Sequence, residues 1–311
     1  MEFIPLGTAA GKPLHGRHLP SMALVMSGRI VLFDCGEAAQ LQMHKVRLRT
    51  SRVETICITH LHGDHFYGLP GLISTMALNN RHRPLTIIAP AELRGILEHL
   101  PGTRSHERSF DIELIPLTDG THGQVFQSDR YTLLTSPLEH RTDTFGYRLE
   151  QAADPPGLDG ARAQALGVSE PAEFRALSQG HRVTTAPGRT IKPEEVLRSP
   201  QPAPSFAYVS DTRPCPGGLE LARRATLLVH EATYLHNLLP KAISTKHSTA
   251  LEAAELAREA DAQALVVCHY SSRYQDPSVL ADEARTAFAH SDWARELERY
   301  PVAVHSRQQA A

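Results

Sequence analysis

The segment His60-Leu61-His62-Gly63-Asp64-His65 constrains this chain more than any other feature of its sequence. Three imidazoles and one carboxylate lie within six residues, directly after the apolar run 54–58. Imidazole and carboxylate are the ligands that zinc and related divalent metals take in proteins. We expect Gly63 to let the backbone turn so that these side chains converge, and Asp64 and His65 to begin the next helix. The segment predicts a metal site, against the alternative of a solvated histidine-rich loop.

Short apolar and alternating runs predict a protein built of strands with helices between them. The predicted strands are 2–6, 22–26, 30–33, 54–58, 85–89, 112–115, 131–134, 205–209, 226–229 and 264–268. Ser27-Gly28-Arg29 is typical of a hairpin turn. Thr249 and Glu252 form a capping box for a helix over 250–260, and Asp276 before Pro277 predicts the start of a helix over 277–289. Alternating strands and helices favour an α/β layered fold.

Residues able to bind metal follow four of the predicted strands. The strands 54–58, 205–209, 226–229 and 264–268 are followed by His60, Asp211, the pair His230 and Glu231, and His269. Ligands bind beyond the carboxyl ends of strands in α/β layers. With His140, the candidate ligands are His60, His62, Asp64, His65, His140, Asp211 and His269. If Asp211 bridges, each of two metals receives four ligands, the arrangement that hydrolyses phosphodiesters. We expect Asp34 to support the ligands, and His230 is as compatible with the core as with catalysis.

The stretch 151–204 breaks the pattern. It is rich in proline and glycine and has little apolar periodicity. We interpret it as a long insertion that projects from a domain spanning residues 1–311, because loops of that length inside a domain usually serve a function or are disordered.

Seven motifs in order along the chain resemble the ribonuclease Z family. They are LFDCGE (32–37), THLHGDHFYGLPGL (59–72), HRTDTFGYRL (140–149), SDTRP (210–214), HEAT (230–233), HST (247–249) and HYSSRY (269–274). The resemblance implies a metallo-β-lactamase αββα sandwich, with two β-sheets flanked by helices. It implies a zinc-dependent endoribonuclease that removes the 3′ trailer from tRNA precursors, and it identifies 152–204 as the protruding arm that holds tRNA.

The resemblance also implies roles for individual residues. His60, His62 and His140 would bind one of two Zn²⁺ ions per subunit, Asp64, His65 and His269 the other, and Asp211 would bridge. A hydroxide shared by the metals would attack the phosphorus, with Asp64 acting as a base toward the water. His247, oriented by Glu231, would donate a proton to the leaving oxygen. The products would be a tRNA with a 3′-OH and a trailer with a 5′-phosphate.

Substrate contacts are implied for Arg17, Ser271 and Arg273. Arg17 lies in the loop 13–18, which in the family senses the end of the acceptor stem and a CCA terminus; here histidines replace the usual lysine and asparagine. The arm carries Ser169–Phe174 in place of the family's Gly-Pro signature, which leaves Arg175, Arg182 and Lys192 to bear RNA affinity. Ser210 stands where glycine commonly precedes the bridging aspartate. The family's short form implies a homodimer in which one arm serves the partner's site.

The amino-acid composition limits which other classes of protein the chain could belong to. The net charge of −2 is not typical of a nucleic-acid-binding protein, so we expect bound divalent metals and a local basic patch to supply the positive field. No apolar run is long enough to span a membrane, and four scattered cysteines favour a reducing, cytoplasmic location. The main alternative is a phosphodiesterase of the same fold that acts on small phosphodiesters, cyclic nucleotides or RNA 3′ ends. A metal-bound RNA-binding protein without activity is disfavoured by the complete ligand set.

Overall fold

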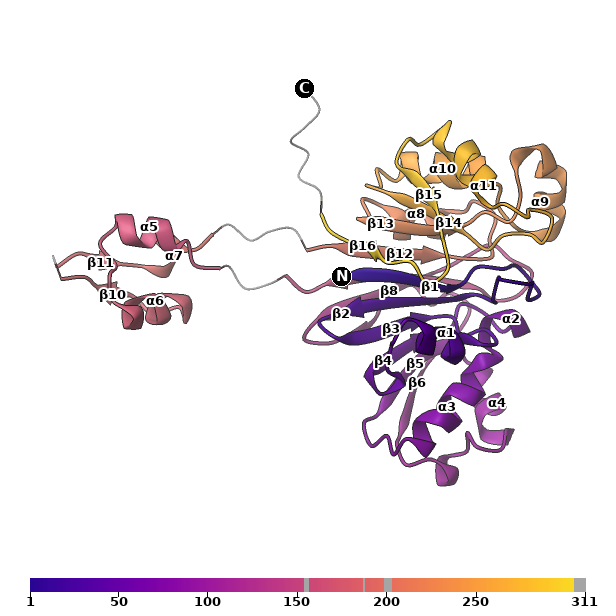
Figure 1. Ribbon diagram of the computed structural model, residues 1–311, viewed down its shortest axis with the longest axis horizontal. Helices are drawn as coiled ribbons and strands as arrows, with labels where there is room; N and C mark the ends of the chain where they lie inside the picture. Colours follow the sequence, from indigo (N-terminus) through magenta and orange to yellow (C-terminus); the bar gives the residue numbers. More distant parts are fainter. Residues whose placement is uncertain (154–156, 187, 199–202, 305–311) are drawn as a thin grey trace. The chain divides into compact units, whose positions relative to one another are not determined.

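The computed structural model describes residues 1–153, 157–186, 188–198 and 203–304, and the chain divides into two compact units (Figure 1). The first contains Met1–Glu150 and the chain from Pro204 onward, and the second contains Gln151–Ala203. Among the described residues, no helix is long and apolar enough to cross a membrane.

The first sheet of the larger unit has seven strands in the order β16-β1-β2-β3-β4-β5-β6. Its strands are β1 (Glu2–Gly7), β2 (Ser21–Met26), β3 (Arg29–Phe33), β4 (Val53–Cys57), β5 (Leu85–Pro90), β6 (Ile112–Leu117) and β16 (Tyr300–Pro301). Ser27 and Gly28 join β2 to β3 with φ of 46° and 74°, as a tight hairpin turn requires. Helices α1 (Ala39–Lys45), α3 (Gly68–Leu78) and α4 (Leu93–His99) cover its outer face (Figure 1).

The second sheet has the order β15-β14-β13-β12-β9-β8-β7. Its strands are β7 (Gly123–Gln127), β8 (Tyr131–Pro137), β9 (Phe145–Gln151), β12 (Ser205–Val209), β13 (Leu227–Glu231), β14 (Leu265–Cys268) and β15 (Ser291–Trp293). Helices α8 (Pro216–Ala222), α10 (Ala250–Glu259) and α11 (Ser278–Arg285) pack on it. Strands β12 and β13 are buried along their whole length, as predicted for runs without alternation.

An aromatic core joins the two sheets. The ring of Phe33 on β3 lies 5.2 Å from that of Phe206 on β12 and 6.1 Å from that of Tyr147 on β9. The Tyr147 hydroxyl donates to the Ile58 carbonyl at 2.7 Å, which ties the end of β4 to the opposite sheet. Because each sheet is covered by helices on one face and by the other sheet on the second, the larger unit is an αββα sandwich, as the sequence predicted.

The ten predicted strands and the capping box of α10 are confirmed. The predicted start and end of the helix over 277–289 are wrong: Pro277 is the N-cap, and α11 ends at Arg285. Asp276, one residue before the N-cap, accepts a bond at 2.9 Å from the amide of Ser278, the first residue of α11. At the other end the Thr286 hydroxyl bonds the Glu283 carbonyl at 2.6 Å, a local side-chain bond of the kind that competes with helix continuation.

The smaller unit is more ordered than its composition indicated. It contains α5 (Gly160–Ala165), α6 (Pro171–Ser178), the hairpin of β10 (Val183–Thr184) and β11 (Thr190–Ile191), and α7 (Pro193–Val196). Its own small core is formed by Ala163, Val168, Leu177, Ile191 and Val196. Nothing in the sequence indicated these helices and strands inside the predicted insertion. Short helices with single apolar anchors leave too weak a periodicity to be recognised.

Candidate metal centre

The segment after β4 carries the first candidate ligands. His60 and His62 precede the short helix α2 (Gly63–Phe66), which contains Asp64 and His65 as predicted. The predicted role of Gly63 is wrong, because Gly63 does not have the positive φ that favours glycine. A Cβ there would instead lie 2.3 Å from the ring of Tyr67, so glycine leaves room for a side chain at the start of the helix.

Three strand ends at the site have a left-handed backbone. Asp34, Asp211 and His269 follow β3, β12 and β14 with φ of 58°, 46° and 59°. Residues other than glycine rarely adopt this conformation and occur in it mainly at functional sites. The turn at each strand end brings a side chain from a different strand toward the same point.

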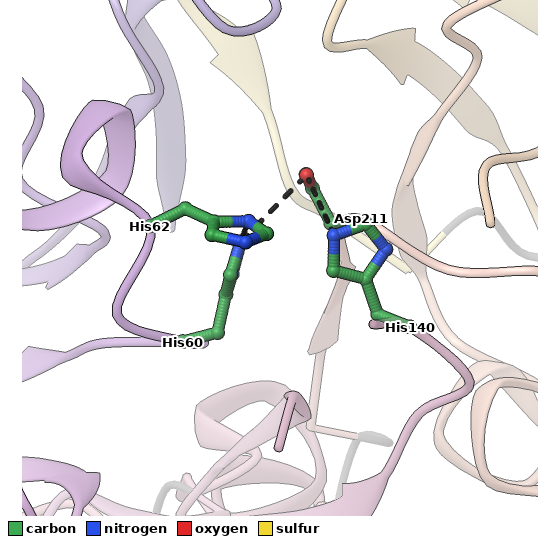
Figure 2. A group of neighbouring side chains, drawn as sticks. All are labelled: His60, His62, His140 and Asp211. Carbon is green, nitrogen blue, oxygen red and sulfur yellow. Dashed lines mark hydrogen bonds and ion pairs between the residues drawn. The ribbon is translucent and has the colours of Figure 1, made fainter. Parts of the chain in front are cut away.

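The first cluster consists of His60, His62, His140 and Asp211, whose ligand atoms lie within 4.8 Å of one another (Figure 2). His60 Nε2 lies 2.8 Å from His62 Nδ1. His60 Nε2 and His140 Nε2 each lie 3.8 Å from Asp211 Oδ2. These nitrogens converge on one side of the Asp211 carboxylate.

The second cluster consists of Asp64, His65 and His269. His65 Nε2 and His269 Nε2 lie 3.3 Å and 3.2 Å from the other carboxylate oxygen of the shared residue, Asp211 Oδ1. Asp64 Oδ2 lies 3.5 Å from His65 Nε2 and 3.9 Å from His269 Nε2. Asp211 therefore presents one oxygen to each cluster, the arrangement expected of a bridging ligand. The Ser210 hydroxyl donates to Asp211 Oδ1 at 3.0 Å and does not disturb it.

Four of the histidines have Nδ1 held by the protein and Nε2 directed to the centre. His65 Nδ1 bonds Asp34 at 2.8 Å, and His140 Nδ1 bonds the Lys246 carbonyl at 2.9 Å. His60 Nδ1 and His269 Nδ1 bond the hydroxyls of Thr59 at 3.0 Å and Thr233 at 2.9 Å. Both hydroxyls donate in turn to carboxylates, of Asp34 and Glu231, so they accept from the rings. Each ring thus keeps a lone pair on Nε2, as metal ligands require.

Asp34 supports the centre without joining it. Its fully buried carboxylate accepts bonds from the Thr59 amide at 2.8 Å, from His65 Nδ1 at 2.8 Å and from the Tyr208 hydroxyl at 3.0 Å. The sequence indicated this supporting role for Asp34 but gave no sign of Tyr208, which comes from the opposite sheet.

The donor set fits divalent metal ions. The Nε2 atoms of His65 and His269 are buried and lack a hydrogen-bond partner among the described residues. Such groups are rare unless something else satisfies them. Burial lowers the pKa of His60 and His140, which favours neutral imidazole. Burial alone would raise the pKa of Asp211, but His269 and His65 hold it well below its usual range, which keeps the carboxylate ionised.

His247 forms a third group of close ligand atoms with Asp211 and His269, and it is paired with a buried acid. His247 Nδ1 lies 2.8 Å from Glu231 Oε1, and Glu231 also accepts bonds from the amides of Thr212 and Thr233 at 2.8 Å and 3.1 Å. Although burial opposes the charged form, Glu231 raises the pKa of His247 to about 9. The His247 ring is stacked on that of His269 with centroids 5.4 Å apart. His230 points elsewhere: its Nδ1 bonds the Glu231 carbonyl within the core.

A cavity of about 290 Å³ opens onto the centre. Ser271 lines it, together with Tyr234, Arg141 and Gly11, none of which the sequence singled out. Arg17 and Arg273 are not among the described residues that line it. The Arg17 guanidinium donates to the Tyr274 carbonyl, and that of Arg273 lies 5.7 Å from the Tyr234 ring centroid. A substrate would have to extend past the cavity to reach either arginine. Of the missed residues, Thr233 lies inside the HEAT motif and could have been recognised.

Comparisons with known proteins agree with the motifs. The family model described as anti-Pycsar protein Apyc1 matches residues 1–147. Ribonuclease Z of Salinibacter ruber is 42% identical over 97% of this chain and 94% of its own length. The crystal structure of the short form of human tRNase Z, ELAC1, is 25% identical with a TM-score of 0.70, over 98% of this chain and 100% of that one.

The fold has further neighbours. The metallo-β-lactamase fold protein YhfI of Bacillus subtilis covers 96% of this chain and 98% of its own, at 15% identity and a TM-score of 0.68. At that identity the likeness concerns the fold alone. The relative that is 42% identical over nearly the full length of both chains decides the family. The chain therefore belongs to the ribonuclease Z family of hydrolytic endoribonucleases and has the metallo-β-lactamase fold.

Proposed function

We propose that this protein is a zinc-dependent endoribonuclease that removes the 3′ trailer from tRNA precursors. The observation that carries the proposal is Asp211, which faces a histidine cluster with each of its two oxygens. The ribonuclease Z name of the Salinibacter ruber relative and the tRNase Z name of the human protein support RNA, and tRNA in particular, as the substrate.

Two zinc ions would be held by the residues of the two clusters, with Asp211 shared. The ligands are His60, His62, His140 and Asp211 for one ion, and Asp64, His65, His269 and Asp211 for the other. When bound, they would supply Lewis acidity toward the phosphate and a water ionised near neutral pH. Asp64, whose Oδ2 accepts a bond from the Gly11 amide at 2.9 Å and which lines the cavity, would act as the base toward the attacking water.

His247 would protonate the leaving oxygen. It lines the cavity, and its Nδ1 is committed to Glu231, so Nε2 carries the proton that can be given to substrate. Water adds to phosphorus, the bond from phosphorus to O3′ breaks, and the proton from His247 passes to O3′. These steps leave a 3′-OH on the tRNA and a 5′-phosphate on the trailer.

A basic surface segment supports RNA binding despite the net charge of −2. No acidic residue occurs from 38 to 53, and Arg47, Arg49 and Arg52 are all exposed. Their side chains make no hydrogen bond or ion pair with any described residue, so the charges are free to meet phosphates. The unit 151–203 is proposed as the arm that holds tRNA, through Arg175, Arg182 and Lys192. Arg17, Ser271 and Arg273 would contact RNA beyond the scissile phosphate.

We also propose a cytoplasmic homodimer. Leu41 on α1 is 62% exposed, and Leu78 on α3 is 80% exposed. The two helices are neighbours, with the Thr75 hydroxyl bonded to Gln40 at 2.8 Å. Apolar side chains exposed on adjoining helices fit burial against a second copy. The four cysteines are all unpaired, as a reducing compartment would keep them.

A phosphodiesterase acting on small phosphodiesters or RNA 3′ ends is the second candidate. The match of residues 1–147 to a family model of another name spans His60, His62 and His140 but neither Asp211 nor His269, and it supports a substrate other than tRNA only as this second candidate. The cavity itself is large enough for only a small part of an RNA chain.

One experiment separates the two candidates. The zinc-loaded protein is incubated in parallel with a tRNA precursor carrying a 3′ trailer and with bis(p-nitrophenyl) phosphate. Asp211→Ala is the control that we expect to be inactive. Asp276→Asn, a substitution at an exposed aspartate, is the control that we expect to keep full activity. Precursor cleavage lost only in Asp211→Ala supports the proposal. Hydrolysis of the small ester without precursor cleavage supports the phosphodiesterase.

A further inference from the structure

The loop between β1 and β2 forms one wall of the cavity. Ala10 and Gly11 line it, and the Gly11 amide donates to Asp64 Oδ2 at 2.9 Å. The Ala10 amide donates to the Tyr270 carbonyl at 3.0 Å, and the Tyr270 amide to the Thr8 carbonyl at 2.8 Å. The loop thus contacts one candidate ligand directly and the residue that follows another, His269. Its position matters for the centre, although it carries no ligand itself.

A single carboxylate far along the chain holds both legs of this loop. Glu296 Oε1 accepts bonds from the Thr8 amide at 3.0 Å and the His18 amide at 2.8 Å. Glu296 Oε2 accepts from His18 Nδ1 at 2.7 Å and from Gln42 Nε2 at 3.1 Å. The Glu296 side chain is only 10% exposed. Thr8 belongs to the leg that leaves β1 and His18 to the leg that enters β2, so Glu296 joins the two legs, beside the direct bond from the Ala9 amide to the His18 carbonyl at 2.8 Å.

We propose that Glu296 is a positioning residue for the reaction, because it fastens the 8–18 loop so that Gly11 stays bonded to Asp64. The proposal rests on the proposed hydrolytic use of the centre, but not on tRNA as the substrate. Donors face both oxygens of Glu296, and only an ionised carboxylate accepts from all of them. An amide at this position would turn its NH₂ group either toward the Thr8 and His18 amides or toward His18 Nδ1 and Gln42 Nε2, so one of the two sets of donors loses its acceptor and the loop is held less tightly.

The predicted effect is local loosening with loss of rate. A displacement of about 1 Å at a catalytic group costs up to roughly 100-fold in rate. In Glu296→Gln we therefore expect kcat for bis(p-nitrophenyl) phosphate to fall about tenfold or more. Backbone hydrogen exchange should accelerate in residues 8–18 and stay unchanged in the strands of both sheets.

Glu298→Gln is the matched control. Glu298 is two residues away, its side chain is 52% exposed, and it pairs with Arg295 rather than with the loop. The values of kcat, KM and melting temperature are measured for both variants and for the full-length wild-type protein, all loaded with zinc. Hydrogen exchange is measured for the same three proteins without metal. Faster exchange in 8–18 with a lower kcat in Glu296→Gln alone supports the proposal. A lower melting temperature with unchanged exchange and kcat would assign Glu296 a purely structural role and overturn it.

A second variant keeps the test decisive if Glu296→Gln does not fold. His18→Ala removes one bond to Glu296 Oε2 and leaves the His18 amide in place, so we expect the same two changes at smaller size. Hydrolysis of the small ester also tests the role of Glu296 independently of whether tRNA is the substrate. If the wild-type protein hydrolyses the ester but not the precursor, tRNA processing fails while the role of Glu296 is still measured.

Discussion

At the scale of single residues, the centre depends on which nitrogen each histidine leaves free. Nδ1 of His65 is bonded to Asp34 and Nδ1 of His140 to the Lys246 carbonyl, so Nε2 is the atom that both present. His247 is not one of the seven candidate ligands, and Glu231, bonded to its Nδ1, raises the pKa of His247 to about 9, so its Nε2 can carry a proton. The same side chain type therefore serves as ligand or acid according to its position and its charge.

The acid role of His247 predicts a dependence on the leaving group. In His247→Gln, kcat for RNA cleavage should fall roughly 10²- to 10⁴-fold, because O3′ is a poor leaving group without a proton. Hydrolysis of bis(p-nitrophenyl) phosphate should fall far less, since p-nitrophenolate leaves unprotonated. Steady-state rates on both substrates and the zinc content of each protein check this. Equal losses on both substrates would instead assign His247 to metal binding or folding.

Much of the residue-level picture could be predicted from the sequence. The seven candidate ligands lie in the two clusters, and their binding of metal stays a prediction. What escaped prediction are the supporting contacts across the fold, such as the Tyr208 hydroxyl on Asp34 and Glu296 on the 8–18 loop. Such contacts join residues far apart in the sequence, and neither motif spacing nor periodicity carries information about them.

At the scale of elements, strand ends build the site. The parallel strands β12, β13 and β14 end at or within two residues of Asp211, Glu231 and His269, and this was predictable because apolar runs flanked by polar residues are strong strand signals. Strands β7 and β9 were not predicted. β7 is only partly buried, so its pattern is weak, and β9 overlaps the motif that begins at His140. The helices of the smaller unit were missed because they are short.

The smaller unit has its own core, formed by Ala163, Val168, Leu177, Ile191 and Val196, so we predict that the larger unit folds without it. Glu150 pairs with Ser205 across β9 and β12, and replacing 151–204 by Asn-Gly would close these strands as a two-residue hairpin. Cleavage of a tRNA precursor should then fall by roughly 100-fold, as expected when about 2.7 kcal/mol of binding free energy is removed. Hydrolysis of bis(p-nitrophenyl) phosphate should stay within about twofold. Retained precursor cleavage would show that residues 151–203 do not hold the RNA.

At the scale of the whole molecule, charge must be distributed unevenly for a protein of net charge −2 to bind RNA. The segment with Arg47, Arg49 and Arg52 precedes β4, whereas the metal centre follows it. A strand of this length spans about 17 Å. RNA bound at this segment would therefore contact the protein at a distance from the scissile bond. Such contacts would raise the affinity for RNA without taking part in the cleavage step.

Neutralising the basic segment should weaken binding without changing the chemistry. For Arg47→Gln, Arg49→Gln and Arg52→Gln combined, the slope of log affinity against log salt should decrease by about one for each phosphate that the variant no longer binds. The control combines Arg94→Gln, Arg258→Gln and Arg285→Gln, which changes the net charge equally at other exposed positions. Filter binding of a precursor at several salt concentrations gives both slopes. Identical slopes for the two triple variants would mean that only the net charge matters.

The chemistry of the new RNA ends tests the central claim most directly. A tRNA precursor is cut by the zinc-loaded protein, and both products are mapped at single-nucleotide resolution with their terminal groups identified. Attack by water with proton donation to O3′ predicts a cut at the base of the acceptor stem, a 3′-OH on the tRNA and a 5′-phosphate on the trailer. A cyclic or 3′-phosphate on the tRNA, or cuts elsewhere, would contradict the account.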